Sequence, residues 1–440
     1  MKSRWIILII VWLLYIINYF DRTSVLTFLP LIREDLNLTH GQIGTAASVF
    51  FFAYALAQFS AGWLSDRIGP KKVIGIAIFV FSFITFVTGL VKNFTQFILI
   101  RLGLGLGEGH HFAPANKTIA NWFPKEEKGR ATGFFSTTWA VAPAIIPVTV
   151  TWLAASLNGW RPVFYCLAVF GILGIFLLFY FIENTPKEAL EKGKISKDEF
   201  EYINSGLIQI NDEKSSKIST KDSLRILLKD ASFWSYSFAL FCVLGIYWGS
   251  TSWISSFLYE QYEFSIKTMG ALASLPYVAA FFAMMTGGWL MDRVFKGRVK
   301  PVLAASFICS IPILLLIAKV PQGNNGLLVL MLILLGFFTN LSFGVVYGYP
   351  QVRYPKEILG SAVGISNGIG QFGSFIAPLV AGFLVIKNAE GIFYTQVFAF
   401  FSVVAIVGLI FTLLLSEKTY NYEEKIGGVQ IASSSAIRKV

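Results

Sequence analysis

The segment Gly62–Arg67 reads Gly-Trp-Leu-Ser-Asp-Arg, and it recurs as Gly288–Arg293 with the sequence Gly-Trp-Leu-Met-Asp-Arg. A second pair of segments, Phe123–Gly133 and Tyr354–Gly364, repeats at nearly the same spacing and shares Pro-Lys-Glu followed by Gly, Ala and Gly. Two matches at one spacing indicate a chain built from two similar halves. Both pairs fall in loops on the same side, so the repeat is parallel, and a site between parallel halves is typical of transport proteins.

Composition excludes an ordinary soluble domain. The chain has 440 residues, of which 55% are hydrophobic and only 14% charged, whereas soluble domains carry about 25% charged residues. The net charge is +11, but the basic residues lie in short loops between apolar runs, where they orient helices and do not form a nucleic-acid surface. The composition therefore indicates a protein that crosses a membrane many times.

Twelve apolar runs are long enough to span a bilayer, six on each side of a polar stretch. We predict an all-α membrane protein with an N-terminal bundle at 1–182, a cytoplasmic linker at 183–230, a C-terminal bundle at 231–415 and a cytoplasmic tail at 416–440. Most lysines and arginines lie on one side, which places both termini in the cytoplasm. The predicted spans are 5–31, 42–64, 73–91, 94–118, 130–155, 161–182, 231–259, 268–290, 299–319, 326–350, 360–386 and 392–415.

Charged residues lie inside two of these spans, at Asp21 and Arg22 and at Arg101 and Glu108. A charge at the centre of a bilayer costs about 2.5–3.5 kcal/mol, so each residue needs a reason to be there. Seven residues is close to two helical turns, so Arg101 and Glu108 share one helix face. They form either an ion pair that joins helices or a site in a polar cavity, in which an arginine binds a carboxylate through two parallel hydrogen bonds.

Neutral polar and aromatic side chains in other spans complete a cavity that suits a ligand rich in hydroxyl groups. Each of them alone is equally well explained by a hydrogen bond between helices. The predicted ligand contacts besides Arg22 are Asn18, Tyr19, Tyr54, Gln58, Tyr247, Trp248, Asn367 and Gln371.

The loop around the first repeat, Gly62–Lys72, resembles the signature between the second and third helices of the major facilitator superfamily, with Pro70 where a basic residue is usual. The resemblance implies two six-helix bundles, related by a pseudo-twofold axis, that rock about a central site. Arg67, Lys71 and Lys72 are placed to hold Asp66, and such charges either latch the bundles together or serve topology alone. The predicted conformational latch is Asp66, Arg67, Asp292 and Arg293.

Three further segments, Asn18–Arg22, Arg101–Glu108 and Trp122–Pro124, together resemble the anion:cation symporter family. That family includes bacterial galactonate and hexuronate transporters, and its animal relatives include sialin and the vesicular glutamate transporters. The combination of these residues is more specific for the family than for any one substrate.

The same resemblance implies a role for each charged residue in the spans. Arg22 is expected to bind the substrate carboxylate, Asp21 and Glu108 to carry protons, and Arg101 to tune Glu108. Trp139 occupies the position at which related carriers often have a glutamine that contacts the sugar, so it joins the predicted ligand contacts.

Two histidines, His110 and His111, follow Glu108, where related carriers usually have small or apolar residues. Because histidine titrates near neutrality, His110 is placed to share or sense the proton of Glu108. The alternative is that His111 makes only a hydrogen bond at the cytoplasmic end of its helix.

From these features we predict a proton-coupled symporter that imports a small organic anion, of the sugar-acid class, across the plasma membrane. Exchange of one anion for another and a non-transporting membrane sensor stay open as alternatives. No phosphate-binding loop, zinc spacing or catalytic triad occurs, so we expect no enzyme activity, no metal and no cofactor other than the proton gradient. The expected partners are the anion, protons and lipid, without nucleic acid, and the expected state is a monomer.

Overall fold

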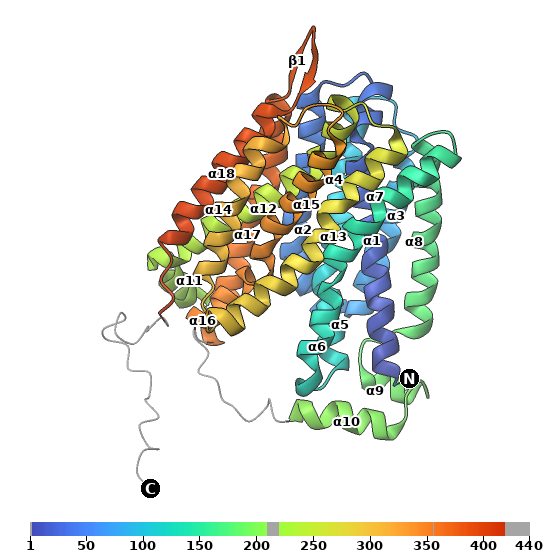
Figure 1. Cartoon of the computed structure of the whole chain (residues 1–440). Helices are drawn as coiled ribbons and strands as arrows, with labels where there is room; N and C mark the ends of the chain where they lie inside the picture. The colour runs from blue at the N-terminus through green and yellow to red at the C-terminus, as the bar shows by residue number, and fades with distance from the viewer. Residues whose placement is uncertain (1, 209–219, 355, 419–440) are drawn as a thin grey trace.

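The computed structural model describes residues 2–208, 220–354 and 356–418. Its long helices run roughly side by side (Figure 1). We call one end of this bundle the hairpin end, because the antiparallel strands β1 (Ile386–Asn388) and β2 (Gly391–Phe393) project there. The opposite end, the terminal end, holds the start of the chain and the short helices α9 (Pro186–Glu191) and α10 (Lys197–Ile208).

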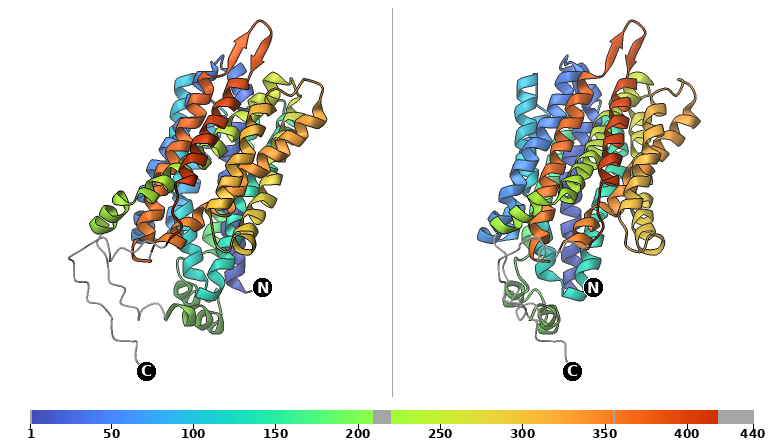
Figure 2. Two further views of the ribbon diagram at one scale, coloured as in Figure 1. Left: turned by 60° about the vertical axis from the view of Figure 1, so that its left-hand side comes forward. Right: turned by 90° about the vertical axis from the view of Figure 1, so that its left-hand side faces the viewer.

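Helices from the N-terminal half form one side of the bundle, as the blue and cyan ribbons of Figure 2 show. They are α1 (Ser3–Asp35), α2 (His40–Ile68), α3 (Pro70–Thr88), α4 (Phe94–Gly109), α5 (Phe112–Trp122), α6 (Lys125–Ser136), α7 (Thr138–Ser156) and α8 (Arg161–Phe181).

Helices from the C-terminal half form the other side, and several end in short 3₁₀ or π turns. They are α11 (Thr220–Lys229), α12 (Ala231–Ser256), η1 (Phe257–Gln261), α13 (Ile266–Trp289), η2 (Leu290–Val294), α14 (Lys300–Ile317), α15 (Asn325–Leu341), η3 (Ser342–Gly344), η4 (Val346–Gly348), α16 (Tyr349–Arg353), α17 (Lys356–Phe383) and α18 (Thr395–Leu413).

Ten helices in the described part of the chain are long and apolar enough to cross a membrane. Each coincides with one predicted span, which confirms a multi-pass membrane protein. The other two predicted spans correspond to α4 with α5 and to α17. The count of twelve spans stays a prediction, because α4 has 16 residues, fewer than the roughly 20 that a bilayer requires.

The apolar segment predicted at 94–118 is not one continuous helix. α4 ends at Gly109, the chain turns at His110 and His111, and α5 then begins at Phe112. Pro114 explains the break, because proline has no backbone N–H and its ring would clash with the carbonyl group of His110, four residues earlier. The turn places Glu108 at the end of a helix and not in the middle of one.

Close approaches between backbones join the two halves toward the hairpin end. A Cβ atom on Gly44 of α2 would lie 2.8 Å from the carbonyl oxygen of Pro378 in α17, and one on Gly270 of α13 would lie 2.7 Å from that of Pro147 in α7. Small residues let membrane helices pack this closely without a hydrophobic driving force. Glycine at these two positions therefore permits the halves to close together.

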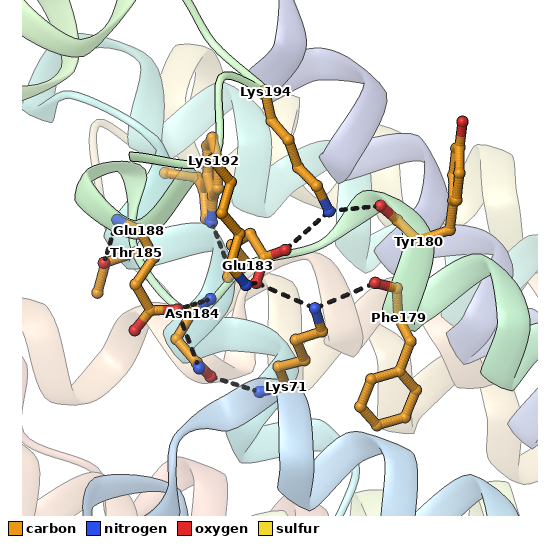
Figure 3. Close-up of polar contacts among 10 residues, drawn as sticks. Lys71, Phe179, Tyr180, Glu183, Asn184, Thr185, Glu188, Lys192 and Lys194 are labelled. Carbon is orange, nitrogen blue, oxygen red and sulfur yellow. Dashed lines mark hydrogen bonds and ion pairs between the residues drawn. The ribbon is translucent and has the colours of Figure 1, made fainter. Parts of the chain in front are cut away.

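The chain after α8 is anchored to the N-terminal half through Glu183 (Figure 3). Its carboxylate accepts hydrogen bonds from Lys194 at 2.7 Å, Lys192 at 2.9 Å and Lys71 at 3.0 Å. Lys194 and Lys71 also donate to the last carbonyl groups of α8, at Tyr180 and Phe179. This cluster, the Glu183 cluster, fixes the first part of the predicted linker against α3 and α8.

Charge compensation within the Glu183 cluster sets the protonation of its carboxyl group. Burial alone would raise the pKa of Glu183, but the hydrogen bonds from the three lysines outweigh burial and hold that pKa at about 2. Because the pKa is lower in the folded protein than its ordinary value of 4.5, the cluster stabilises the fold above about pH 4.5 and loses that effect as the pH falls toward 2.

Glu183→Gln should lower the free energy of unfolding at pH 7 by about 1–3 kcal/mol, because three lysines lose their common anion while water screens the exposed ones. The loss should vanish near pH 2, where Glu183 itself becomes protonated. Thermal unfolding of purified protein at several pH values tests this. Glu188→Gln is the control, since the donor to the Glu188 carboxylate among the described residues is Asn184. An equal loss in both variants would contradict the prediction.

Candidate functional site

A cavity of about 330 Å³ lies between the two halves, within the range of small-molecule sites. The structure brings together around it every predicted ligand contact except Asn18. Those residues are Tyr19, Arg22, Tyr54, Gln58, Trp139, Tyr247, Trp248, Asn367 and Gln371.

Arg22 is the charged group of the cavity wall. Its guanidinium group lies over four aromatic rings, with 4.5 Å to the ring centre of Tyr54, 4.9 Å to Phe50, 5.1 Å to Tyr19 and 5.2 Å to Trp248. A cation over aromatic faces is attracted by their quadrupoles, more strongly where water is excluded. Trp248 comes from α12, so the ring cage around Arg22 is shared by both halves.

Glu108 is paired with Arg22, which differs from the predicted partner. One oxygen, Oε2, accepts from Nη2 of Arg22 at 2.8 Å and from Nε at 3.0 Å. The Glu108 side chain has no exposed surface, and its other oxygen has no hydrogen-bond partner among the described residues. The spacing within α4 suggested a pair with Arg101, but the closer cation comes from another helix.

Arg101 is fully buried and is not among the residues that line the cavity, so it does not face the ligand site as Arg22 does. Its Nε donates to the carbonyl oxygen of Ala46 at 3.0 Å, Nη2 lies 3.4 Å from that of Ala47, and its guanidinium group lies 4.5 Å from the ring centre of Phe50. Both carbonyl groups belong to α2. Gly105 lets α4 approach α2 this closely, because a Cβ atom on residue 105 would clash with the carbonyl oxygen of Phe50. Arg101 thus adds a fixed positive charge behind the site.

Asp21 and Asn18 also lie behind the cavity wall. Both side chains are buried, and neither is among the residues that line the cavity. Both Asn18 side-chain atoms and one Asp21 oxygen lack a hydrogen-bond partner within the described residues. Helical spacing predicted that Asn18 flanks the ligand, because it lies one turn before Arg22, but its side chain is enclosed by the protein and does not reach the cavity.

The two histidines have different surroundings. His110 is hydrogen-bonded at 2.8 Å both to Ser60 and to the carbonyl oxygen of Leu106, so it makes the helix-end contacts that we had considered for His111. His111 is fully buried between the rings of Tyr15 and Phe81, at 5.4 and 6.1 Å, and makes no hydrogen bond to the described residues. A proton-coupling role for either histidine stays a prediction.

Several lining residues were missed from the sequence, among them Tyr15 and Tyr347. Tyr15 precedes Tyr19 by four residues and Arg22 by seven, so helical periodicity offered a signal for it. Tyr347 lies in η4, where an apolar run leaves regular helical geometry, and the sequence offered no comparable signal there. Its ring lies 6.1 Å from that of Trp139, across the boundary between the halves.

At the hairpin end, Glu260 of the C-terminal half binds two residues of the N-terminal half. It accepts from Arg33 at 2.7 Å, lies 2.7 Å from Nε2 of His40, and accepts from Tyr394 at 2.6 Å. The Glu260 side chain is 2% exposed. This group, the Glu260 cluster, closes the hairpin end by electrostatic contact in addition to the glycine packing. The sequence analysis did not single it out.

At the terminal end, the predicted latch residues contact other partners than expected. Asp66 binds Lys117 of α5 at 2.6 Å, and Arg67 lies over the Trp63 ring at 4.6 Å. We had expected Arg67, Lys71 and Lys72 to hold Asp66, but the cation that binds Asp66 is Lys117, because α5 reaches this end of α2. Lys71 instead binds Glu183. Asp292 and Arg293 are exposed in η2, and the latch role of all four residues stays a prediction.

A bundle of membrane helices in two halves, with one arginine in a cavity between them, defines a membrane transporter. The chain matches the Major Facilitator Superfamily over residues 11–378 and again over 256–438, so it belongs to that family. As predicted, it is a transporter and not an enzyme.

Relatives of this chain have names that describe transporters of organic acids. One from Escherichia coli (strain K12), named a probable L-galactonate transporter, is 30% identical over 84% of this chain and 80% of its own. One from Bacillus subtilis (strain 168), named a probable galactarate/D-glucarate transporter, is 31% identical over 89% of this chain and 87% of its own. A D-galactonate transporter of Escherichia coli O6:H1 is 26% identical over 94% of this chain and 96% of its own.

Solved structures confirm the fold. A bacterial homologue of the human lysosomal transporter Spinster, in an inward-facing and occupied conformation, has a TM-score of 0.76 at 17% identity and covers 94% of this chain and 96% of its own. A D-xylose–proton symporter has a TM-score of 0.69 at 14% identity, and the match covers 94% of this chain and 99% of the symporter.

Glu260→Gln should weaken the closed hairpin end, by about 1–3 kcal/mol, because Arg33 and His40 lose their common carboxylate. Spin labels at Lys92 and Ala389, one on each half, should then report longer distances by electron–electron double resonance.

The neighbouring exposed acid Glu263 provides the control variant, Glu263→Gln, which should leave the distances unchanged. A distance distribution for Glu260→Gln identical to that of the native chain would show that glycine packing alone keeps this end closed.

Proposed function

We propose that this chain is a proton-coupled symporter that imports a sugar acid by alternating access. The observation that carries the proposal is the buried Arg22–Glu108 pair at the wall of a cavity between the halves. An arginine is the side chain that best binds a carboxylate, and a buried carboxylate beside it is a proton acceptor. The names of the relatives support a sugar acid as the anion.

The coupling follows from competition for one cation. While Glu108 is ionised, its Oε2 holds both Nε and Nη2 of Arg22, and a second carboxylate at the same nitrogens would meet a like charge. A proton on Glu108 removes that charge and frees Arg22 to bind the substrate. The anion then replaces the lost negative charge, so the loaded site has few uncompensated charges when it closes.

Orientation completes the cycle. We place the terminal end in the cytoplasm and the hairpin end outside, in the plasma membrane, in accord with the distribution of basic residues. The Glu260 cluster then closes the outside, and the conformation is the one that releases substrate inward. Opening requires separation of Arg33 and His40 from Glu260. One chain contains the whole cavity, which favours a monomer, and the proton gradient supplies the driving force without a bound cofactor.

Arg22→Lys should weaken binding of galactonate at least about tenfold while the protein still folds. The ammonium group keeps the charge but loses the planar fork that binds two oxygens. Isothermal titration of the purified chain measures the affinity. Arg161→Lys, which alters an arginine–aspartate pair away from the cavity, should bind like the native chain. Unchanged affinity in Arg22→Lys would remove Arg22 as the carboxylate ligand.

Glu108→Gln should abolish uphill uptake driven by a pH gradient and retain binding and substrate counterflow. The amide resembles the protonated acid in shape, so Arg22 stays available to the anion, whereas release of the coupling proton no longer occurs. Uptake and counterflow of the same labelled galactonate in liposomes separate the two processes.

Glu390→Gln, on the exposed hairpin, is the control and should behave as the native chain. Native accumulation by Glu108→Gln would place the coupling proton elsewhere, with Asp21 as the next candidate.

A further inference from the structure

We infer that the cavity selects sugar acids with one carboxylate, such as aldonates and uronates, and rejects the matching dicarboxylates. This inference rests on the proposed function and narrows it. The distinction is chemical, because the relatives include proteins named as transporters of both kinds, galactonate with one carboxylate and galactarate with two. Fold and family therefore leave the choice open.

The first observation is the charge of the lining. Of the described residues that surround the cavity, Arg22 is the one with a charged side chain, and the others are aromatic, aliphatic, amide or glycine residues. Arg101, the other cation of the site, is fully buried behind the wall and bound to carbonyl groups of α2. One available guanidinium group compensates one carboxylate.

The second observation is the chemistry opposite the arginine. Gln58 lies one helical turn beyond Tyr54 on α2, about 6 Å along the axis, and Tyr54 covers the Arg22 guanidinium group. Gln58 faces α17, where Asn367 donates weakly to its amide oxygen at 3.5 Å. α17 runs antiparallel to α2, since Gly44 approaches Gly382 and Gly368 approaches Phe59. Gln371, one turn after Asn367, therefore lies back toward the level of Tyr54, and the amides farthest from the arginine are those of Gln58 and Asn367. The cavity therefore has a cationic end and an amide end, separated by about the length of a short polyol chain.

Amides and carboxylates differ in what they recognise. An amide group both donates and accepts, which matches a hydroxyl group, whereas an ionised carboxylate only accepts. At the amide end, a second carboxylate would face the oxygens of Gln58 and Asn367 as well as their N–H groups. It would be buried without a counter-charge when the halves close. Burial of an ion without a partner is strongly unfavourable.

The aromatic walls favour the same kind of ligand. Trp139, Tyr247 and Trp248 offer ring faces to the C–H side of a polyol, and Tyr247 approaches the Trp139 carbonyl oxygen at 3.4 Å across the halves. Such walls contribute contact area and no counter-charge. Hydroxyl groups at the amide end and a single carboxylate at Arg22 thus satisfy the whole cavity.

The test compares acids that differ only in the oxidation of the terminal carbon: galactonate with galactarate, and gluconate with glucarate. Titration of the purified full chain should give each monocarboxylate a Kd at least about tenfold lower than that of its dicarboxylate, as expected when a buried group is left without a partner. A galactarate Kd equal to or lower than that of galactonate would overturn the inference and leave the proposed function intact. Binding of none of the four acids would overturn both.

A gain-of-function variant tests the cause. Asn367→Arg adds a second cation at the amide end and should shift the ratio of the two Kd values toward the dicarboxylate by about tenfold or more. Gln58→Arg adds the same charge from the other half and serves if the first variant does not fold. Ala389→Arg adds it on the hairpin, outside the cavity, and should leave the ratio unchanged. An unchanged ratio in folded Asn367→Arg and Gln58→Arg would show that cation number does not set the selectivity.

Discussion

The ion pair between Arg22 and Glu108 is the constraint on which the rest of the site depends. Both side chains are almost without exposed surface, and charges in such surroundings persist only when they compensate each other. Glu108 uses one oxygen for Arg22 and leaves the other without a partner in the described chain. The two charges of the pair thus compensate each other, but one Glu108 oxygen makes no hydrogen bond. A proton on Glu108 or a second anion at Arg22 would therefore strongly change the net charge of the site.

The two halves divide the work unequally, although they descend from one repeated pattern. The N-terminal half supplies Arg22 to the cavity and holds Asp21, Arg101 and Glu108 buried behind it, whereas the C-terminal half supplies neutral amide and aromatic groups to the same cavity. A change of charge at the cavity therefore occurs in the N-terminal half. It alters how that half packs against the C-terminal half, whose own charge stays the same. The Glu260 cluster reverses this arrangement at the hairpin end, where an anion of the C-terminal half meets cations of the N-terminal half.

Sequence predicted the architecture well because membrane spans and repeats are local patterns. Charged residues inside apolar runs were also conspicuous, since their cost in a bilayer demands a reason. What the sequence did not reveal was which charges pair. The spacing of Arg101 and Glu108 fits one helix face, but Glu108 binds Arg22 of another helix, and that choice depends on how α1, α2 and α4 pack. The Glu260 cluster was hidden for the same reason, because its members are far apart in the chain and each lies beside an ordinary loop.

The fixed position of Arg101 explains why a single arginine at the cavity is enough for the proposed cycle. Its guanidinium group donates to α2 carbonyl oxygens and lies over Phe50, the same ring that Arg22 approaches from the cavity side. A cation held in this way cannot follow a ligand, but its field acts on Glu108 and on any anion at Arg22 throughout the cycle. In the proposed cycle, the positive field would therefore stay constant while the negative partner of Arg22 alternates between Glu108 and the substrate. If both arginines were free, each anion would retain its own cation, and a proton on Glu108 would no longer decide whether the substrate binds.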